Sequence, residues 1–220
     1  MPVRIKLKTI DLWGESMEDQ VVKYENTPTE NGQIVFYGAS YFTRWNTAWG
    51  NVPLEDCILG KSGKKCAVNR GFGSSNSEHQ LYYYTRMVRA IEPAALVYEC
   101  YANGEWAGYP IEERFELGTR VMQYAENDFP ELRIYILGPH PSPKDDSAEV
   151  EQKRLFSSWL REFAAQSENR HFVDVLGYPG FAPDRWEGLF IEDKVHFSAA
   201  GYEVYAKLLR EALADELARY

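Results

Sequence analysis

The sequence contains no apolar run close to the roughly 18–20 residues that a membrane-spanning helix needs. Its first residues are basic, but they lack the apolar segment and the small-residue cleavage site of a secretory signal. Basic residues are outnumbered, since 24 Lys and Arg stand against 33 Asp and Glu, a formal net charge of −9. Because such a surface repels phosphate groups and anionic lipids, we expect no nucleic-acid partner and no membrane partner. These absences predict a soluble, cytoplasmic protein.

Cysteine is scarce, with only Cys57, Cys66 and Cys100 in the chain. None of them forms a C-x-x-C pair, so neither a zinc site nor a dithiol redox site is indicated. Cys100 lies in an apolar run and is expected to be a buried small hydrophobe. Cys57 and Cys66 flank a short loop and would be able to pair in an oxidising compartment, whereas reduced thiols are the expectation in the cytoplasm.

Motifs that hold metals or nucleotides are also missing. There is no H-E-x-x-H, and the four histidines show no metal-ligand spacing. The glycine-rich residues 71–76 fail the dinucleotide-binding pattern because Asn76 stands at the third glycine position. Gly60-Lys61-Ser62 is no P-loop, since Glu55 stands where its first glycine is required. We therefore expect neither a metal nor a cofactor.

What the sequence does contain is a regular alternation of short apolar runs and longer amphipathic ones. Short runs rich in β-branched or aromatic residues predict strands at residues 33–37, 65–68, 94–101, 132–137 and 172–175. Apolar residues at helical spacing predict helices at residues 77–90, 111–124, 149–165 and 199–217. Strands that alternate with helices imply a parallel sheet with helices on both faces, an α/β fold.

A single doubly wound domain is the expected organisation, because the chain shows no internal repeat, no low-complexity tract and no interdomain linker. Residues 1–30 are expected to form an N-terminal arm or helix packed on the domain, and residues 31–220 the domain itself. The sequence leaves a homo-oligomer open. In such sheets ligands bind outside the carboxyl ends of the strands, so the segments that follow each strand are the candidates for function.

Ser40 follows the first predicted strand, in Gly38-Ala39-Ser40, where small residues permit a sharp turn. Its hydroxyl would then lie at the sheet edge beside backbone N–H groups, or it would merely cap the next helix. Near the other end of the chain, Asp193 precedes His196 by three residues. Histidine is the natural base for a serine nucleophile, and a carboxylate fixes its tautomer. The alternative is an acidic helix cap beside a surface histidine.

Two further segments end at the same edge. The glycines in Gly71-Phe72-Gly73-Ser74 would let backbone N–H groups face an anion, or they form an ordinary turn. Asn103 would point an amide N–H at a developing oxyanion, or it makes a turn with Gly104. The loops at residues 45–65 and 179–189 are expected to set specificity.

The remaining histidines are weaker candidates. His140 follows the fourth predicted strand and is a candidate to line the pocket. His79 lies on a predicted helix and His171 leads a predicted strand, so both are expected to be structural or exposed.

In their order along the chain, these segments resemble the SGNH (GDSL-type, lipase-like) hydrolase family, in its bacterial branch with an N-R-G-F-G second block. Residues 34–40 (IVFYGAS) resemble the first block, residues 68–75 (VNRGFGSS) the second, and residues 190–202 (FIEDKVHFSAAGY) closely match the fifth. Residues 98–108 occupy the place of the third block but lack its G-x-N-D pattern. The resemblance spans about residues 34–212.

The resemblance implies a flavodoxin-like three-layer α/β/α sandwich with a mainly five-stranded parallel sheet. It also implies a serine esterase that acts on small acyl or acetyl esters, a small-molecule substrate, through an acyl-enzyme. Carried over residue by residue, Ser40 is the nucleophile, His196 the general base and Asp193 its orienting partner.

The oxyanion hole implied by the resemblance has three hydrogen-bond donors. These are the backbone N–H of Ser40, a backbone N–H at Gly73 or Ser74, and the side-chain amide of Asn103. The chain departs from the family at Ala39, where the family usually has Asp or Ser.

Two other functions stay open on the sequence alone. One is a binding module for a carbohydrate or small ester that kept the fold but lost efficient catalysis, which the degraded third block favours. The other is a flavodoxin-like nucleotide or flavin binder, motivated by the fold class and the glycines after the second strand.

Overall fold

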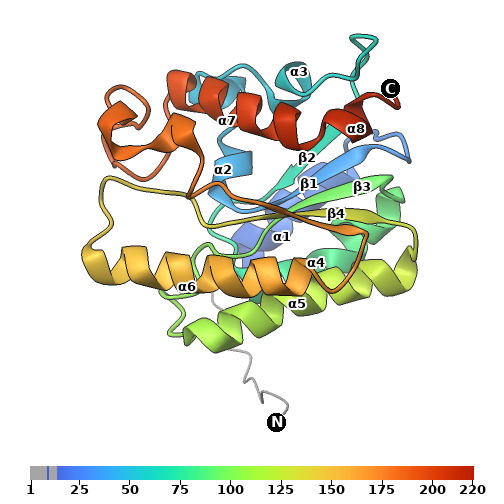
Figure 1. Ribbon diagram of the computed structural model, residues 1–220. Coiled ribbons are helices and arrows are strands. Elements are labelled where there is room, and N and C mark those ends of the chain that lie inside the picture. Colours follow the sequence, from blue (N-terminus) through green and yellow to red (C-terminus); the bar gives the residue numbers. More distant parts are fainter. Residues whose placement is uncertain (1–8, 10–13) are drawn as a thin grey trace.

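The computed structural model describes residue 9 and residues 14–220. Within these residues, five parallel strands form one sheet in the order β2-β1-β3-β4-β5 (Figure 1). The strands are β1 (Ile34–Gly38), β2 (Ala67–Gly71), β3 (Ala95–Glu99), β4 (Arg133–Leu137) and β5 (Arg170–Val173). The predicted α/β class and the five-stranded parallel sheet are confirmed.

Helices cover both faces of the sheet, which makes a three-layer sandwich (Figure 1). The layer on one face contains α1 (Gly14–Glu25), α4 (Ser77–Met87), α5 (Ile111–Asp128) and α6 (Ser147–Ala164). The other contains α2 (Ser40–Thr43), α3 (Leu54–Cys57), α7 (Ala199–Ala212) and α8 (Ala214–Leu217). Short 3₁₀ helices lie at Thr47–Trp49, Arg89–Ile91, Pro179–Phe181 and Pro183–Arg185. Each described helix is too short or too polar to cross a bilayer.

The strands are apolar nearly throughout because the sheet is buried on both faces. In β1, Ile34 and Phe36 pack into the core beneath α7, whereas Val35 and Tyr37 pack into the core beside α4. Successive side chains of a strand point to opposite faces, so one strand serves two separate cores. Continuous burial therefore takes the place of the alternating polar pattern of a one-sided sheet.

The order in which successive strands are added reverses at β1, because β2 pairs with one of its edges and β3 with the other. This is the topological switch point of a flavodoxin-like sheet, outside which such folds bind ligands. Gly38, the last residue of β1, is opposite Gly71, the last residue of β2. The segments that leave these two strands therefore start at the same level of the sheet.

Strand β2 runs beyond its predicted end at residue 68, through a polar stretch to Gly71. The polar side chains there are satisfied by distant partners, since the Asn69 amide donates to the Phe42 carbonyl at 2.8 Å. Local apolar pattern therefore underestimates the length of this strand.

Strand β3 and helix α7 are shorter than predicted. The chain leaves the sheet after Glu99, where the carbonyl of Cys100 accepts a hydrogen bond from the Ser77 hydroxyl at 2.7 Å. The helix predicted at residues 199–217 is interrupted at Leu213, which separates α7 from α8. Cys57, Cys66 and Cys100 are all free, and Cys66 and Cys100 are buried.

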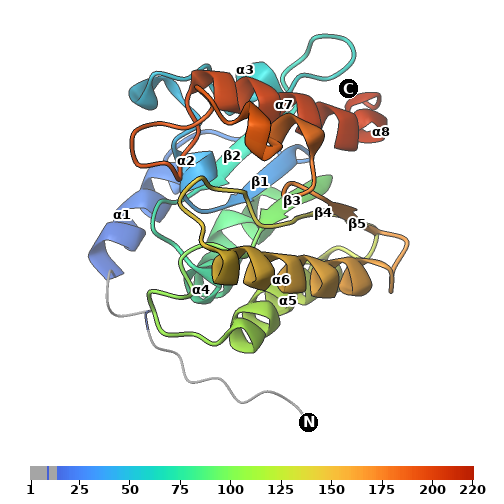
Figure 2. The same ribbon diagram turned by 60° about the vertical axis from the view of Figure 1, so that its left-hand side comes forward.

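Helix α1 lies beside α4 at the margin of the sandwich (Figure 2). Its Met17 and Val21 are fully buried in the core on that face. The part of the predicted N-terminal arm at residues 1–8 and 10–13 lies outside the described residues. The division of the chain at residue 31 stays a prediction.

Gly71 ends β2 directly beneath α2, and this close approach generates a test of the fold. A Cβ at Gly71 would overlap the Cβ of Phe42 and lie 2.7 Å from the Thr43 nitrogen. Gly71→Ala must therefore push α2 off the sheet, and we expect a loss of about 1–3 kcal/mol in the free energy of unfolding. Equilibrium unfolding in urea measures this loss.

Gly73→Ala is the matched control, because the nearest atom to a Cβ there is 3.6 Å away. An equal loss in both variants would contradict the steric explanation.

Candidate active site

Ser40 opens α2 where the chain leaves β1. Gly38 is required at the end of the strand, since a Cβ there would lie 2.8 Å from Oε2 of Glu99. The helix N-cap is Ala39, and no side chain makes a capping hydrogen bond. The alternative that Ser40 merely caps the helix is therefore wrong, and its hydroxyl is directed elsewhere.

The Ser40 hydroxyl oxygen lies 2.8 Å from Nε2 of His196. On the other side of the ring, Nδ1 lies 2.7 Å from Oδ2 of Asp193. The tautomer with its proton on Nδ1 satisfies both contacts, because Nδ1 then donates to the carboxylate and Nε2 accepts from the hydroxyl. Ser40, His196 and Asp193, from the two ends of the domain, are thus joined by two consecutive hydrogen bonds.

The turn at residues 193–196 is held on both sides. Phe190 and Phe197 form a short antiparallel bridge around it. Lys194 adopts a left-handed conformation with φ 58°. Its carbonyl oxygen accepts a hydrogen bond from the Ser142 hydroxyl, with 2.7 Å between the two oxygens. These contacts fix the turn so that the His196 side chain lies beside Ser40.

Asp193 is not a helix cap, because Ser198 fills that position at the start of α7. Its Oδ1 instead accepts the backbone N–H groups of Val195 and His196, both at 2.9 Å. The carboxylate is therefore committed to its own turn and to the imidazole.

Electrostatics give the two ionisable members the states that general-base chemistry needs. Burial raises the pKa of Asp193, but hydrogen bonds from His196 and from the Val195 N–H outweigh it and lower this pKa to about 2. Burial also lowers the pKa of His196 against the opposing effect of Asp193, and the Arg44 guanidinium lowers it further. At neutral pH the carboxyl is ionised and the imidazole is neutral.

Arg44 connects this carboxylate to an exposed tryptophan, a link that sequence reasoning missed. Its Nη1 lies 3.3 Å from Oδ2 of Asp193. Its guanidinium carbon lies 4.4 Å from the centre of the Trp49 ring, which is 53% exposed. The only signal in the sequence was a cation one helical turn after Ser40.

The predicted backbone donors differ in their availability. The N–H of Gly73 is occupied, since it donates to Oε1 of Gln20 on α1 at 2.7 Å. The N–H groups of Ser40 and Ser74 make no hydrogen bond with the residues that the structure describes. Ser74 adopts a left-handed conformation with φ 65°. Of the predicted backbone donors, Ser40 and Ser74 are therefore the ones left free by the described residues.

Asn103 is brought to the same loop by its side chain. Its Nδ2 donates to the carbonyl of Ser75 at 2.8 Å, and its backbone is left-handed with φ 59°. This bond uses one of the two amide hydrogens and orients the other. The side chain is therefore anchored immediately beside Ser74.

The other histidines have structural surroundings. His140 is buried, with its ring stacked on Tyr41 at 3.7 Å between ring centres. It does not border the two cavities that adjoin residues 177–179. Burial lowers the pKa of His140 well below the usual value. His79 is buried in the first turn of α4, and His171 is half-buried on β5. The described residues hold no cluster of three or more side chains suited to a metal.

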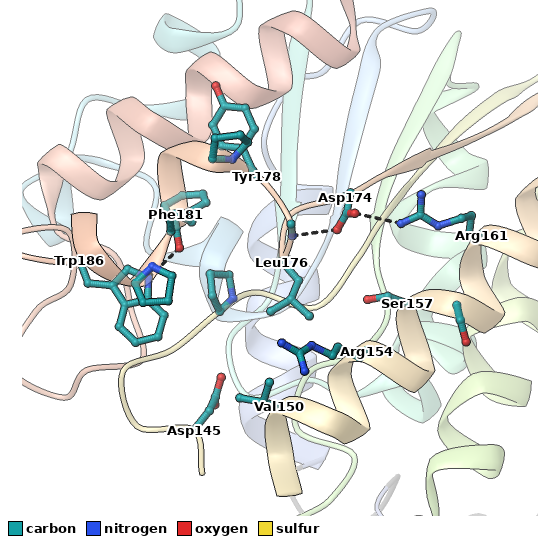
Figure 3. Close-up of a pocket in the computed structure, with 16 residues that line it drawn as sticks. Asp145, Val150, Arg154, Ser157, Arg161, Asp174, Leu176, Tyr178, Phe181 and Trp186 are labelled. Carbon is teal, nitrogen blue, oxygen red and sulfur yellow. Dashed lines mark hydrogen bonds and ion pairs between the residues drawn. The ribbon is translucent and has the colours of Figure 1, made fainter. Parts of the chain in front are cut away.

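A cavity of about 500 Å³ lies between α6 and the segment at residues 174–186 (Figure 3). Its apolar wall includes Phe181 and Trp186, from one of the loops predicted to set specificity. Arg161 lies on the opposite side, paired with Asp174 at 2.9 Å. Ser40, His196 and Asp193 do not border this cavity.

Several solved structures share this fold. A protein of Streptococcus pneumoniae proposed as a platelet activating factor matches with a TM-score of 0.73 at 18% identity, over 94% of this chain and 95% of that one. A GDSL-like lipase of Bacteroides thetaiotaomicron matches with a TM-score of 0.68 at 16% identity, over 96% and 100%. An acetyl xylan esterase of Geobacillus stearothermophilus matches with a TM-score of 0.59 at 15% identity, over 84% and 95%.

These likenesses confirm the fold that the resemblance implied, a three-layer α/β/α sandwich. No protein-family model matches the chain, and no curated protein sequence is significantly similar to it.

The position of Arg44 generates a prediction about His196. Arg44→Gln removes a cation that repels the imidazolium and competes for Asp193, so we expect the pKa of His196 to rise. Titration of the imidazole resonances by NMR measures the shift.

Arg89→Gln is the control, because Arg89 precedes β3 at the opposite edge of the sheet and pairs there with Asp128 at 3.6 Å. A His196 pKa that falls or stays constant in Arg44→Gln would contradict the role assigned to Arg44.

Proposed function

We propose that this protein is a serine esterase of the SGNH (GDSL-type) hydrolase family that hydrolyses small acyl or acetyl esters. The observation that carries the proposal is the line of hydrogen bonds from Asp193 through His196 to Ser40, at 2.7 and 2.8 Å. The order of the motifs and the shared fold support it. A binding module without catalysis has no need of this alignment.

In the first step, Ser40 Oγ attacks the ester carbonyl while Nε2 of His196 takes the hydroxyl proton. The imidazole is neutral at pH 7 because burial lowers its pKa, so it is ready to accept this proton. Asp193, ionised and held by two backbone N–H groups, stabilises the imidazolium that forms.

The oxyanion that develops on the carbonyl needs donors fixed in advance. The free N–H groups of Ser40 and Ser74 and the second amide hydrogen of Asn103 supply them in this proposal. Gly73 is omitted, because Gln20 occupies its N–H.

Collapse of the tetrahedral intermediate releases the alcohol, which takes the proton from His196 and leaves the acyl group on Ser40. A water molecule then repeats the sequence, with His196 again as the base, and the acid is released. Every step uses side chains and backbone groups of this chain.

Covalent labelling tests the nucleophile. A fluorophosphonate should add once to the wild-type protein, not at all to Ser40→Ala, and much more slowly to His196→Ala, because only an activated serine attacks the reagent. Intact-mass spectrometry over time measures the adduct.

Ser158→Ala is the matched control, since Ser158 is an exposed serine on α6 whose hydroxyl bonds only the Leu155 carbonyl. A wild-type protein that stays unlabelled at high reagent and long times would remove the hydrolase proposal.

The amide of Asn103 generates a second prediction. Asn103→Gly removes the donor without straining the left-handed backbone, which glycine adopts freely. We expect kcat on p-nitrophenyl acetate to fall by about 10²–10³ with little change in KM, as for the loss of one oxyanion donor.

Asn26→Gly, at an exposed position after α1, is the control. An unchanged kcat in Asn103→Gly would take Asn103 out of the oxyanion hole and leave the two backbone donors.

A further inference from the structure

A buried carboxyl group lies directly against the turn that precedes Ser40. Glu99 ends β3 and is 1% exposed. Its Oε2 accepts the backbone N–H of Ala39 at 3.0 Å. The same oxygen occupies the space beside Gly38, where a Cβ would lie 2.8 Å away. The carboxyl group therefore lies against the last residue of β1 and against the residue that precedes Ser40.

The Ala39 residue is held from both sides. Glu99 takes its N–H, and its carbonyl accepts the N–H groups of Phe42 and Thr43 at 3.2 and 3.1 Å. That carbonyl belongs to the same peptide as the N–H of Ser40. Fixing Ala39 therefore fixes the direction of the Ser40 N–H, which is one of the free donors of the site.

Glu99 has no cationic partner among lysines and arginines of the described residues. The nearest basic group is His140, whose Nδ1 lies 3.8 Å from Oε1, beyond hydrogen-bonding distance. Nε2 of His140 is buried and makes no hydrogen bond within the described part of the chain. Burial raises the pKa of Glu99 to about 7, against the opposing effect of the Ala39 N–H.

Burying a carboxyl group without a cationic partner at the end of β3 costs desolvation free energy. The rest of β3 is Ala95, Leu96, Val97 and Tyr98, all buried, so an apolar residue at its end would avoid the cost of desolvation. Buried ionisable groups with shifted pKa values gather at functional sites. The cost of burying it therefore indicates that the carboxyl group of Glu99 has a functional role that an apolar side chain would not fill.

Among the described buried groups that face Glu99, none other changes charge near neutral pH. Those that face it or act on its neighbour His140 are Tyr41 on α2, Cys100 after β3, Tyr202 and Tyr205 on α7, and, beyond His140, Lys153 and His196. Burial raises the pKa values of the three tyrosines and of Cys100, so these groups are neutral at pH 7.

We propose that Glu99 is a positioning residue, whose carboxylate anchors the Ala39 N–H and thereby sets the orientation of the Ser40 peptide in the oxyanion hole. This inference rests on the proposed esterase function. The ionised form holds the N–H more strongly than the acid form, because charge-assisted hydrogen bonds are about twice as strong as neutral ones. Activity should therefore rise as Glu99 loses its proton.

Two substitutions separate positioning from packing. Glu99→Gln keeps an oxygen that accepts the Ala39 N–H but cannot ionise. Because this neutral amide holds the N–H about as the protonated acid does, we expect a kcat near the wild-type level on the acid side of the step. The pH profile should lose its rise near pH 7 and keep only the acid limb of His196. Glu99→Leu keeps the volume without an acceptor, and we expect kcat to fall about 10- to 100-fold with KM unchanged, since the Ser40 peptide is misplaced.

Glu216→Gln is the matched control, because Glu216 is also 1% exposed but pairs with Arg133, at the first residue of β4. Its pH profile should match that of the wild type. A wild-type kcat in Glu99→Leu, or a step near pH 7 that survives in Glu99→Gln, would overturn the proposal.

An NMR titration tests the anchor independently of catalysis, with the wild-type protein and Glu99→Gln compared. The Ala39 amide proton should shift as pH passes through about 7 in the wild type and stay constant in Glu99→Gln. A constant Ala39 resonance in the wild type would overturn the anchor. A titrating resonance in a protein that a fluorophosphonate does not label would keep the anchor and remove the esterase.

Discussion

Backbone pairing along both edges of β1 sets where Ser40, Ser74, Glu99 and Asn103 lie. The ladder with β2 brings Gly38 opposite Gly71, and the ladder with β3 aligns Tyr37 with Tyr98. Because these strands are parallel and in register, they release their chains at one level of the sheet. Glu99 ends β3 at this level, and the segments that leave there carry Ser40, Ser74 and Asn103. A slip of one residue in either ladder would exchange the two faces of a strand and separate these groups.

The pKa values of two carboxyl groups near Ser40 are shifted in opposite directions by their surroundings. Asp193 is partly exposed and receives three hydrogen bonds from its own turn, and its pKa falls to about 2. Glu99 is buried and receives one, and its pKa rises to about 7. The number of donors and the access of water decide the difference. One group therefore carries a permanent charge beside His196, while the other changes charge within the working range of an enzyme.

Local patterns predicted the elements better than their ends. The five strands follow from short apolar runs. Strand β2 nevertheless continues through Asn69, because the carbonyl of Phe42, far along the chain, accepts a hydrogen bond from the Asn69 side-chain amide. The candidate site divides in the same way. Ser40 and the pair Asp193 and His196 stand in short segments whose residue types and spacing already indicate chemistry. Gln20, which occupies the Gly73 N–H, belongs to no such segment.

The sequence by itself determined the alternation of strands and helices, the parallel sheet, and the three side chains that meet at its edge. These depend on the spacing of apolar residues and on residue type, which are local properties. Only the tertiary structure decided which backbone donors are free, that Arg44 shares the Asp193 carboxylate, and that Glu99 lies against the turn before Ser40. Such contacts join residues remote in the chain, and burial and distance, which set hydrogen bonding and pKa values, exist only once the layers have packed.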